Sequence, residues 1–150
     1  MTKKEIKEFS LRIAESSKTE LIVITYDIIL NYIEAAKEAY ESSNPDDVVF
    51  NLQKAKQFVN NLSSCLDFRY SIAQELLRLY IYVNNCLVKD IIKREPQSAG
   101  IIKEIIGKLR ESYHNISPLD KSGKVMKNSE QVYVGYTYGK TSTLNEVVIR

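Results

Sequence analysis

The chain has 150 residues, the length of a single domain, and 44% of them are apolar and 27% charged. Five glycines and three prolines are too few for a collagen-like or low-complexity chain, and a domain of this size buries enough surface to fold without disulfides. The net charge of +2, from 21 basic and 19 acidic residues, gives no general attraction to nucleic acid or to anionic membranes. We therefore expect a globular domain that binds no nucleic acid.

Residues suited to metal binding or catalysis are scarce. His114 is the single histidine of the sequence, so the clustered ligands of zinc and di-iron sites are not available. Cys65 and Cys86 lie in helix-like stretches, where a reduced pair is favoured over a disulfide. We expect no metal, no other cofactor and no enzymatic activity.

The sequence contains no stretch typical of a signal peptide or a transmembrane helix. Glu5 and Glu8 interrupt the basic N-terminus, and the most apolar stretch, residues 21–30, is far too short to span a bilayer. We therefore expect a cytoplasmic protein that does not insert into membranes.

A glycine-containing segment near the end of the chain imitates a phosphate-binding loop. Gly135 and Gly139 are followed by Lys140 and Thr141, but three residues separate the glycines where the loop needs four. The loop also needs a parallel sheet before it and a helix after it, and no β-α alternation precedes this segment. Nucleotide binding is therefore disfavoured.

Helical periodicity dominates the first 115 residues. A short amphipathic helix is predicted over residues 3–14. Ser17 and Glu20 form the pattern of a capping box, which predicts a long helix from there to about Ser42. Two adjacent apolar stripes run along this long helix: Leu21, Ile24, Ile28, Tyr32, Ala35 and Ala39, and beside them Ile22, Tyr26, Ile29, Ile33, Ala36 and Tyr40. Such a helix either buries more than half of its circumference or keeps one apolar side for a partner.

Three further helices are predicted after the long one. Asn44 is a good N-cap and Pro45 fits the first helical position, so the next helix begins there. Its apolar residues alternate in steps of four and three, as in a bundle: Val48, Leu52, Ala55, Val59, Leu62 and Leu66. The pattern breaks at residues 67–70 and resumes to about Arg94 with Ile72, Leu76, Leu79, Val83 and Leu87. Pro96 opens the last helix, which continues to Tyr113.

These elements predict an all-α fold. Short connections between long amphipathic helices favour antiparallel neighbours, so we expect an antiparallel up-down-up-down four-helix bundle with a short extra N-terminal helix. This bundle should occupy residues 1–115. Residues 116–150 lose the helical periodicity and predict a flexible or partly ordered, irregular C-terminal tail, in which residues 132–138 alternate like a short strand.

Four motifs follow one another along the chain: the apolar stretch that ends in Tyr26-Asp27, the segment Ala36-Lys37-Glu38-Ala39, the stretch Ser64-Cys65-Leu66-Asp67-Phe68, and the run Leu79-Tyr80-Ile81-Tyr82-Val83-Asn84. Taken in this order, they resemble the flagellar secretion chaperone family FliS. Each motif alone is common in helical proteins, but their order and spacing match the family within residues 17–113. The resemblance implies a non-catalytic chaperone that protects newly made flagellin before export.

The resemblance also implies a partner, the C-terminal segment of flagellin. This segment is disordered before assembly, and a bundle with an apolar groove holds such a segment as helices. We expect binding to prevent premature polymerisation and to precede delivery to the flagellar export apparatus, with export gate components as further partners. Whether the free protein forms a homodimer is left open. The alternative function is a non-catalytic helical-bundle regulatory or scaffold module that binds another helical ligand.

The groove is expected along the second stripe of the long helix and the run that ends at Asn84. Ten tyrosines against four phenylalanines support this expectation, because a tyrosine hydroxyl is costly to bury without a partner. An apolar stripe is, however, more often core than groove in an ordinary bundle. The expected partner-binding residues are Ile22, Tyr26, Ile29, Ile33, Tyr80, Val83, Asn84 and Leu87.

Overall fold

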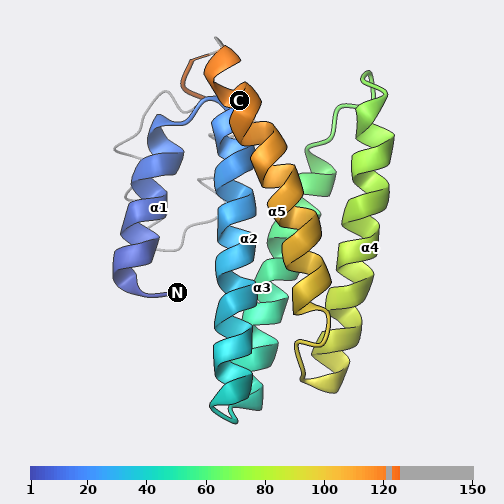
Figure 1. Cartoon of the computed structure of the whole chain (residues 1–150). Coiled ribbons are helices and arrows are strands. Elements are labelled where there is room, and N and C mark those ends of the chain that lie inside the picture. The colour runs from blue at the N-terminus through green and yellow to red at the C-terminus, as the bar shows by residue number, and fades with distance from the viewer. Residues whose placement is uncertain (121–122, 126–150) are drawn as a thin grey trace. The chain divides into compact units, whose positions relative to one another are not determined.

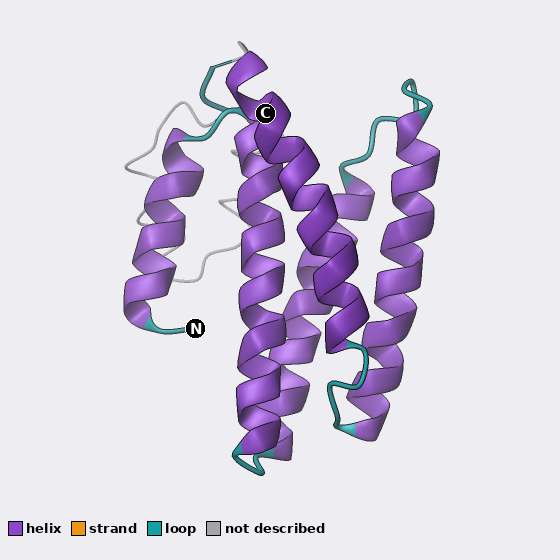
Figure 2. Cartoon of the chain, viewed as in Figure 1, coloured by secondary structure: helices purple, strands orange, loops and turns teal. Residues whose placement is uncertain are grey.

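The computed structural model describes residues 1–120 and 123–125, which form five α-helices and one short 3₁₀ helix (Figure 1). The helices are α1 (Lys3–Glu15), α2 (Lys18–Glu41), α3 (Pro45–Ser64), α4 (Ile72–Lys93) and α5 (Ala99–Ile116), followed by the 3₁₀ helix Ser117–Leu119. Within the described residues there is no strand (Figure 2). The predicted all-helical class is confirmed, and the helices are consistent with a bundle.

The chain divides into two compact units, which are described separately. The larger unit comprises residues 25–109, and the smaller one comprises residues 1–24 together with the described residues 110–120 and 123–125. The boundary between a helical domain, 1–115, and a tail, 116–150, stays a prediction. The strand-like residues 132–138 and the glycine segment 135–141 lie outside the described residues.

The long helices begin where the local capping signals predict. The Ser17 Oγ accepts a hydrogen bond from the Glu20 N–H at 3.3 Å, and the Glu20 carboxylate accepts one from the Ser17 N–H at 3.4 Å. This reciprocal pair is the capping box predicted for α2. At α3 the Asn44 side chain accepts a hydrogen bond from the Asp47 N–H, and Pro45 occupies the first turn. Both starts depend on residues at most three positions apart, so the sequence pattern was sufficient to predict them.

In the smaller unit, residues after α5 bind the start of α2. The Asp120 carboxylate accepts hydrogen bonds from the Thr19 N–H at 2.9 Å and from the Thr19 hydroxyl at 2.6 Å. A carboxylate at this position also interacts favourably with the positive end of the helix dipole. The Val125 N–H donates to the Ser16 carbonyl at 3.0 Å. The described beginning of the predicted tail is therefore held by specific hydrogen bonds.

The core of the larger unit contains the predicted stripe of α3. Five of its six residues are buried, namely Val48, Leu52, Ala55, Val59 and Leu62, and the sixth, Leu66, is half-buried after the end of the helix. The α4 helix packs along α3 (Figure 1). The other buried apolar residues of this unit are Tyr26, Ile28, Ile29, Ile33, Ala36, Ala73, Leu76, Tyr80, Val83, Leu87, Ala99, Ile102 and Ile106.

The predicted apolar stripe of α4 is wrong at two positions. Ile72 and Leu79 are 55% and 37% exposed, and Ala73 and Tyr80 are buried instead. The hydroxyl of Tyr80 lies 2.6 Å from the hydroxyl of Tyr26, so the polar end of each ring has a partner inside the core. A tyrosine with a paired hydroxyl packs in a core at little cost, which makes it a better inner residue here than its neighbour Leu79.

The last helix begins three residues later than the position of Pro96 predicts. Ser98 immediately precedes α5, and its N–H and hydroxyl donate to the buried carboxylate of Asp90 at 2.9 Å and 3.0 Å. These two bonds hold Ser98 in place, so the first helical residue is Ala99. The contact between Asp90 and Ser98 joins two segments across a turn that no local capping pattern predicts.

Candidate functional site

Two tyrosines from separate motifs meet inside the larger unit. Tyr26 of α2 and Tyr80 of α4 are 0% and 2% exposed, and their hydroxyl oxygens form a hydrogen bond of 2.6 Å. Because each hydroxyl has a hydrogen-bond partner inside the core, neither tyrosine needs to lie at an interface. The expectation that tyrosines border an interface applies better to Tyr40 and Tyr82, which are 48% and 50% exposed.

The structure places most of the expected partner-binding residues in the core. The buried ones are Tyr26, Ile29, Ile33, Tyr80, Val83 and Leu87. Ile22 and Asn84 are half-buried. A fully buried side chain contacts a partner only after its neighbours move. In the described structure, the two expected partner-binding residues that remain partly accessible to a partner are Ile22 and Asn84.

Sequence reasoning did not assign a group of exposed apolar side chains to the site. They belong to α4 and to the connection that precedes it: Phe68, Tyr70, Ile72, Leu79, Ile81, Tyr82 and Ile92. An exposed apolar side chain is ordinary when it stands alone, so only those that lie together on one side of the helix, such as Ile81 and Ile92, can form a binding surface. One signal was available in the sequence, because Ile81 and Ile92 share their side of the helix with Leu77 and Val88.

Asn84 has an unusual environment. In the described part of the chain, its Oδ1 is the one buried side-chain polar atom with no hydrogen-bond partner. Buried polar atoms in native proteins are nearly always paired, because an unpaired one retains its cost of desolvation. This half-buried residue therefore carries an acceptor that its own bundle does not use.

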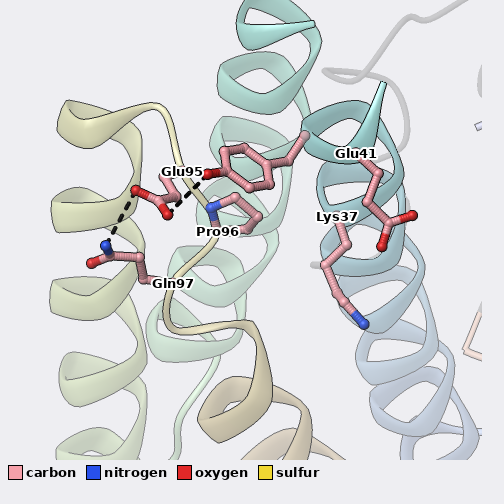
Figure 3. A pocket seen from close by; sticks show the side chains of 6 residues that line it. Lys37, Glu41, Glu95, Pro96 and Gln97 are labelled. Atoms are coloured by element: carbon pink, nitrogen blue, oxygen red, sulfur yellow. Dashed lines mark hydrogen bonds between the residues drawn. The ribbon is translucent and has the colours of Figure 1, made fainter. Parts of the chain in front are cut away.

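A small pocket lies beside the end of α2 and the connection from α4 to α5 (Figure 3). It is lined by Lys37, Tyr40, Glu41, Glu95, Pro96 and Gln97 and has a volume of about 160 Å³. The Tyr40 hydroxyl and the Gln97 amide donate to the two oxygens of the Glu95 carboxylate at 3.1 Å and 3.2 Å. The hydrogen bond to this carboxylate raises the pKa of Tyr40. Ligand sites usually exceed roughly 300 Å³, and Glu95 is already engaged, so we assign no ligand to this pocket.

The described surface offers apolar contact, hydrogen bonding and charged side chains. His114 is exposed on α5. The described residues contain no group of three side chains arranged to hold a metal ion. In the same part of the chain, no helix combines the length and the apolar character needed to cross a membrane.

The chain matches a known protein family. The family described as flagellar protein FliS matches residues 3–120. The matched range contains all five described α-helices and each of the four motifs noted in the sequence. No curated protein matches the chain. Because the matched range is far more than half of the sequence, this chain belongs to the flagellar protein FliS family, a family of flagellar export chaperones.

Proposed function

We propose that this chain is a cytoplasmic chaperone that binds the C-terminal segment of flagellin, prevents its premature polymerisation and delivers it to the flagellar export apparatus. The observation that carries the proposal is the family match over residues 3–120. The exposed isoleucines Ile81 and Ile92, which share one side of α4, support it, because they provide contact area for an amphipathic segment. Components of the export gate are further partners in this proposal.

We propose an antiparallel order of α2, α3, α4 and α5 as the scaffold of this chaperone. Three contacts inside the larger unit support this order. The ring of Tyr32 on α2 stacks on Phe58 on α3 with centroids 6.0 Å apart. The Glu34 carboxylate on α2 accepts a hydrogen bond from Lys103, near the start of α5, at 2.9 Å. Tyr26 pairs with Tyr80 at matching distances from the starts of α2 and α4, as expected for helices of equal direction.

The expected partner-binding residues enter the proposal in two roles. Ile22 in the smaller unit and Asn84 in the larger unit are half-buried, and each offers a direct contact within its own unit. The buried residues support the surface from beneath, because their packing sets the positions of α2 and α4: Tyr26, Ile29, Ile33, Tyr80, Val83 and Leu87. A disordered segment loses conformational entropy when it folds on binding, so a rigid supporting core preserves affinity.

A titration tests the proposal. The full chain is titrated with a peptide that copies the C-terminal end of the flagellin encoded in the same genome, and with a scrambled peptide of the same composition. We expect saturable one-to-one binding of the flagellin peptide, with a gain of helical circular dichroism as the peptide folds. Absence of binding, or equal binding of the scrambled peptide, would contradict the proposed partner and favour a scaffold module for another helical ligand.

The oligomeric state of the free chain is a separate measurement. A surface that is apolar and uncovered favours self-association. If the free protein forms a homodimer through the partner-binding surface, sedimentation velocity will show a dimer alone and a one-to-one complex after addition of the flagellin peptide. A dimer that persists in the complex would place the dimer contact elsewhere.

A further inference from the structure

One side of α4 carries apolar side chains that remain accessible. Leu77, Ile81, Asn84, Val88 and Ile92 follow one another in steps of three and four, so they share one side of the helix. Ile81 and Ile92 are 49% and 77% exposed, and the other three residues are half-buried. We call these five residues the α4 strip. It lies beside the buried stripe of the same helix.

The outer edge of the α4 strip is basic. Arg78 precedes Ile81 by three residues, and Lys89 precedes Ile92 by three, so each cation lies next to an exposed isoleucine. Both basic side chains belong to exposed residues. This arrangement matches a partner segment that packs apolar side chains on the strip and places carboxylates over the two cations.

Asn84 places one polar side chain in the middle of the α4 strip. Its Oδ1 is buried without a partner in the described chain. If the side chain turns outward, this oxygen reaches the surface and accepts a hydrogen bond from an N–H group of a bound segment. A single asparagine in an apolar seam fixes the alignment of two helices in coiled coils, because other alignments leave its amide unpaired. Asn84 is likewise a single asparagine among apolar side chains on one side of α4.

We infer that the α4 strip docks the flagellin segment, that this segment is amphipathic with acidic residues along one edge, and that Asn84 fixes its alignment. The inference rests on the proposed function, since the occupant is the same segment. It adds the location of the contact, the charge of the partner and the residue that sets the register.

The first test replaces one exposed isoleucine of the strip. In Ile81→Asp, a charge is placed where the partner packs, and affinity for the flagellin peptide should fall at least about tenfold. The matched control is Ile72→Asp, because Ile72 is an isoleucine of the same helix, is 55% exposed and lies outside the strip. The control should bind within about twofold of the unchanged protein. Circular dichroism verifies that both variants are folded.

The second test concerns charge. Affinity of the unchanged protein should decrease as salt is raised, because salt screens the attraction between exposed cations and carboxylates. The double variant Arg78→Glu with Lys89→Glu should bind more weakly, and its affinity should rise with salt, because like charges then face each other. Affinity with the same salt dependence in both proteins would overturn the acidic-edge part of the inference.

The third test separates binding from stability at Asn84. Asn84→Leu removes the unpaired oxygen, so the melting temperature should rise by roughly 2–4 °C for a chain of this length. The same variant should bind the flagellin peptide more weakly, because the register-setting amide is lost. A residue with only a structural role would show no loss of affinity in a more stable protein, and that result would overturn the role assigned to Asn84.

The outcomes distinguish the inference from the proposed function. If the unchanged protein does not bind the flagellin peptide, the proposed function fails and the inference fails with it. If the unchanged protein binds and Ile81→Asp binds equally well, the proposed function stands and the α4 strip is excluded as the docking surface. If Ile81→Asp binds weakly and Ile72→Asp binds normally, the result supports both the proposed function and the α4 strip as the docking surface.

Discussion

In the larger unit, a tyrosine hydroxyl forms a hydrogen bond both at the buried centre and at the exposed end of α2. At the centre, the Tyr26 hydroxyl pairs with that of Tyr80, and both residues are buried. At the end, the Tyr40 hydroxyl donates to the Glu95 carboxylate at 3.1 Å, and Tyr40 is 48% exposed. Water replaces a lost partner at the end but not at the centre. A tyrosine hydrogen bond therefore has a large effect on the stability of this bundle only where the hydroxyl is sealed from solvent.

The largest effect should follow from a charge placed in the centre. Val83 is 0% exposed on the buried side of α4, and in Val83→Asp an unpaired carboxylate is buried. This costs several kcal/mol, a large part of the roughly 5–15 kcal/mol that stabilise a domain. We expect the variant to be unfolded by circular dichroism. The matched control is Ile92→Asp at the end of the same helix. Ile92 is 77% exposed, so water solvates the new carboxylate and the variant should keep native helicity. A folded Val83→Asp protein would contradict the orientation of α4.

A double-mutant cycle on the tyrosine pair sharpens the comparison. Tyr26→Phe and Tyr80→Phe each remove the same buried hydrogen bond, so each should lower the free energy of unfolding by about 1 kcal/mol. In the double variant no hydroxyl remains, and its cost should be smaller than the sum of the two single costs. Urea unfolding measures all four proteins. Strictly additive costs would show that the two hydroxyls do not interact.

The contact between Asp90 and Ser98 is intermediate in burial and should have an effect of similar size. Ser98→Ala removes the hydroxyl that donates to the Asp90 carboxylate, and stability at neutral pH should fall by about 1–2 kcal/mol. Burial raises the pKa of Asp90, and the hydrogen bonds from Ser98 oppose this rise because they favour the ionised form.

The pH dependence of that variant gives an independent check. The pKa of Asp90 is higher in the folded state than in the unfolded state, so protonation of this carboxyl favours folding. This contribution to stability is fully present below the unfolded pKa and is lost as the pH rises through the folded pKa. The hydroxyl of Ser98 stabilises the ionised carboxylate, so the cost of Ser98→Ala should be largest at neutral pH and shrink near about pH 4. Urea unfolding at both pH values measures this difference. An equal cost at both would contradict the assigned role of the hydroxyl.

The smallest effect is expected at the exposed end. Tyr40→Phe removes the hydrogen bond to Glu95, but water solvates the carboxylate in its place. The melting temperature should remain within experimental error of the unchanged protein. The comparison would fail if Tyr40→Phe destabilised the bundle as much as Tyr26→Phe.

Sequence and structure agree where the signal is local. The capping box of Ser17 and Glu20, the Asn44 cap and the apolar stripe of α3 all depend on residues within a few turns of one another. The capping box of α1, where Thr2 and Glu5 exchange hydrogen bonds, follows the same rule, although the sequence analysis did not single it out. The four family motifs are likewise linear patterns, so membership of the family was apparent from the sequence and was confirmed by the family match.

The candidate site depended on information that the linear pattern does not contain. The second stripe of α2 has the same spacing whether it faces the core or a partner, and the structure places Tyr26, Ile29 and Ile33 in the core. The exposed apolar residues of α4 were not assigned to the site, because their spacing resembles that of the buried stripe beside them. Asn84 was selected from its motif, but its unpaired oxygen is visible only when the surrounding helices are in place.

The sequence by itself determined that this chain forms helices, where α2 and α3 begin, and to which family it belongs, because caps, periodicity and motifs are properties of neighbouring residues. Tertiary structure decided which side of α4 faces inward. Leu79 and Tyr80 are adjacent and both apolar enough to be buried, and a helix that rotates by about 100° per residue exchanges one for the other. Tyr80 is the buried one because Tyr26, 54 positions away, gives its hydroxyl a partner, and that contact exists only in the folded chain.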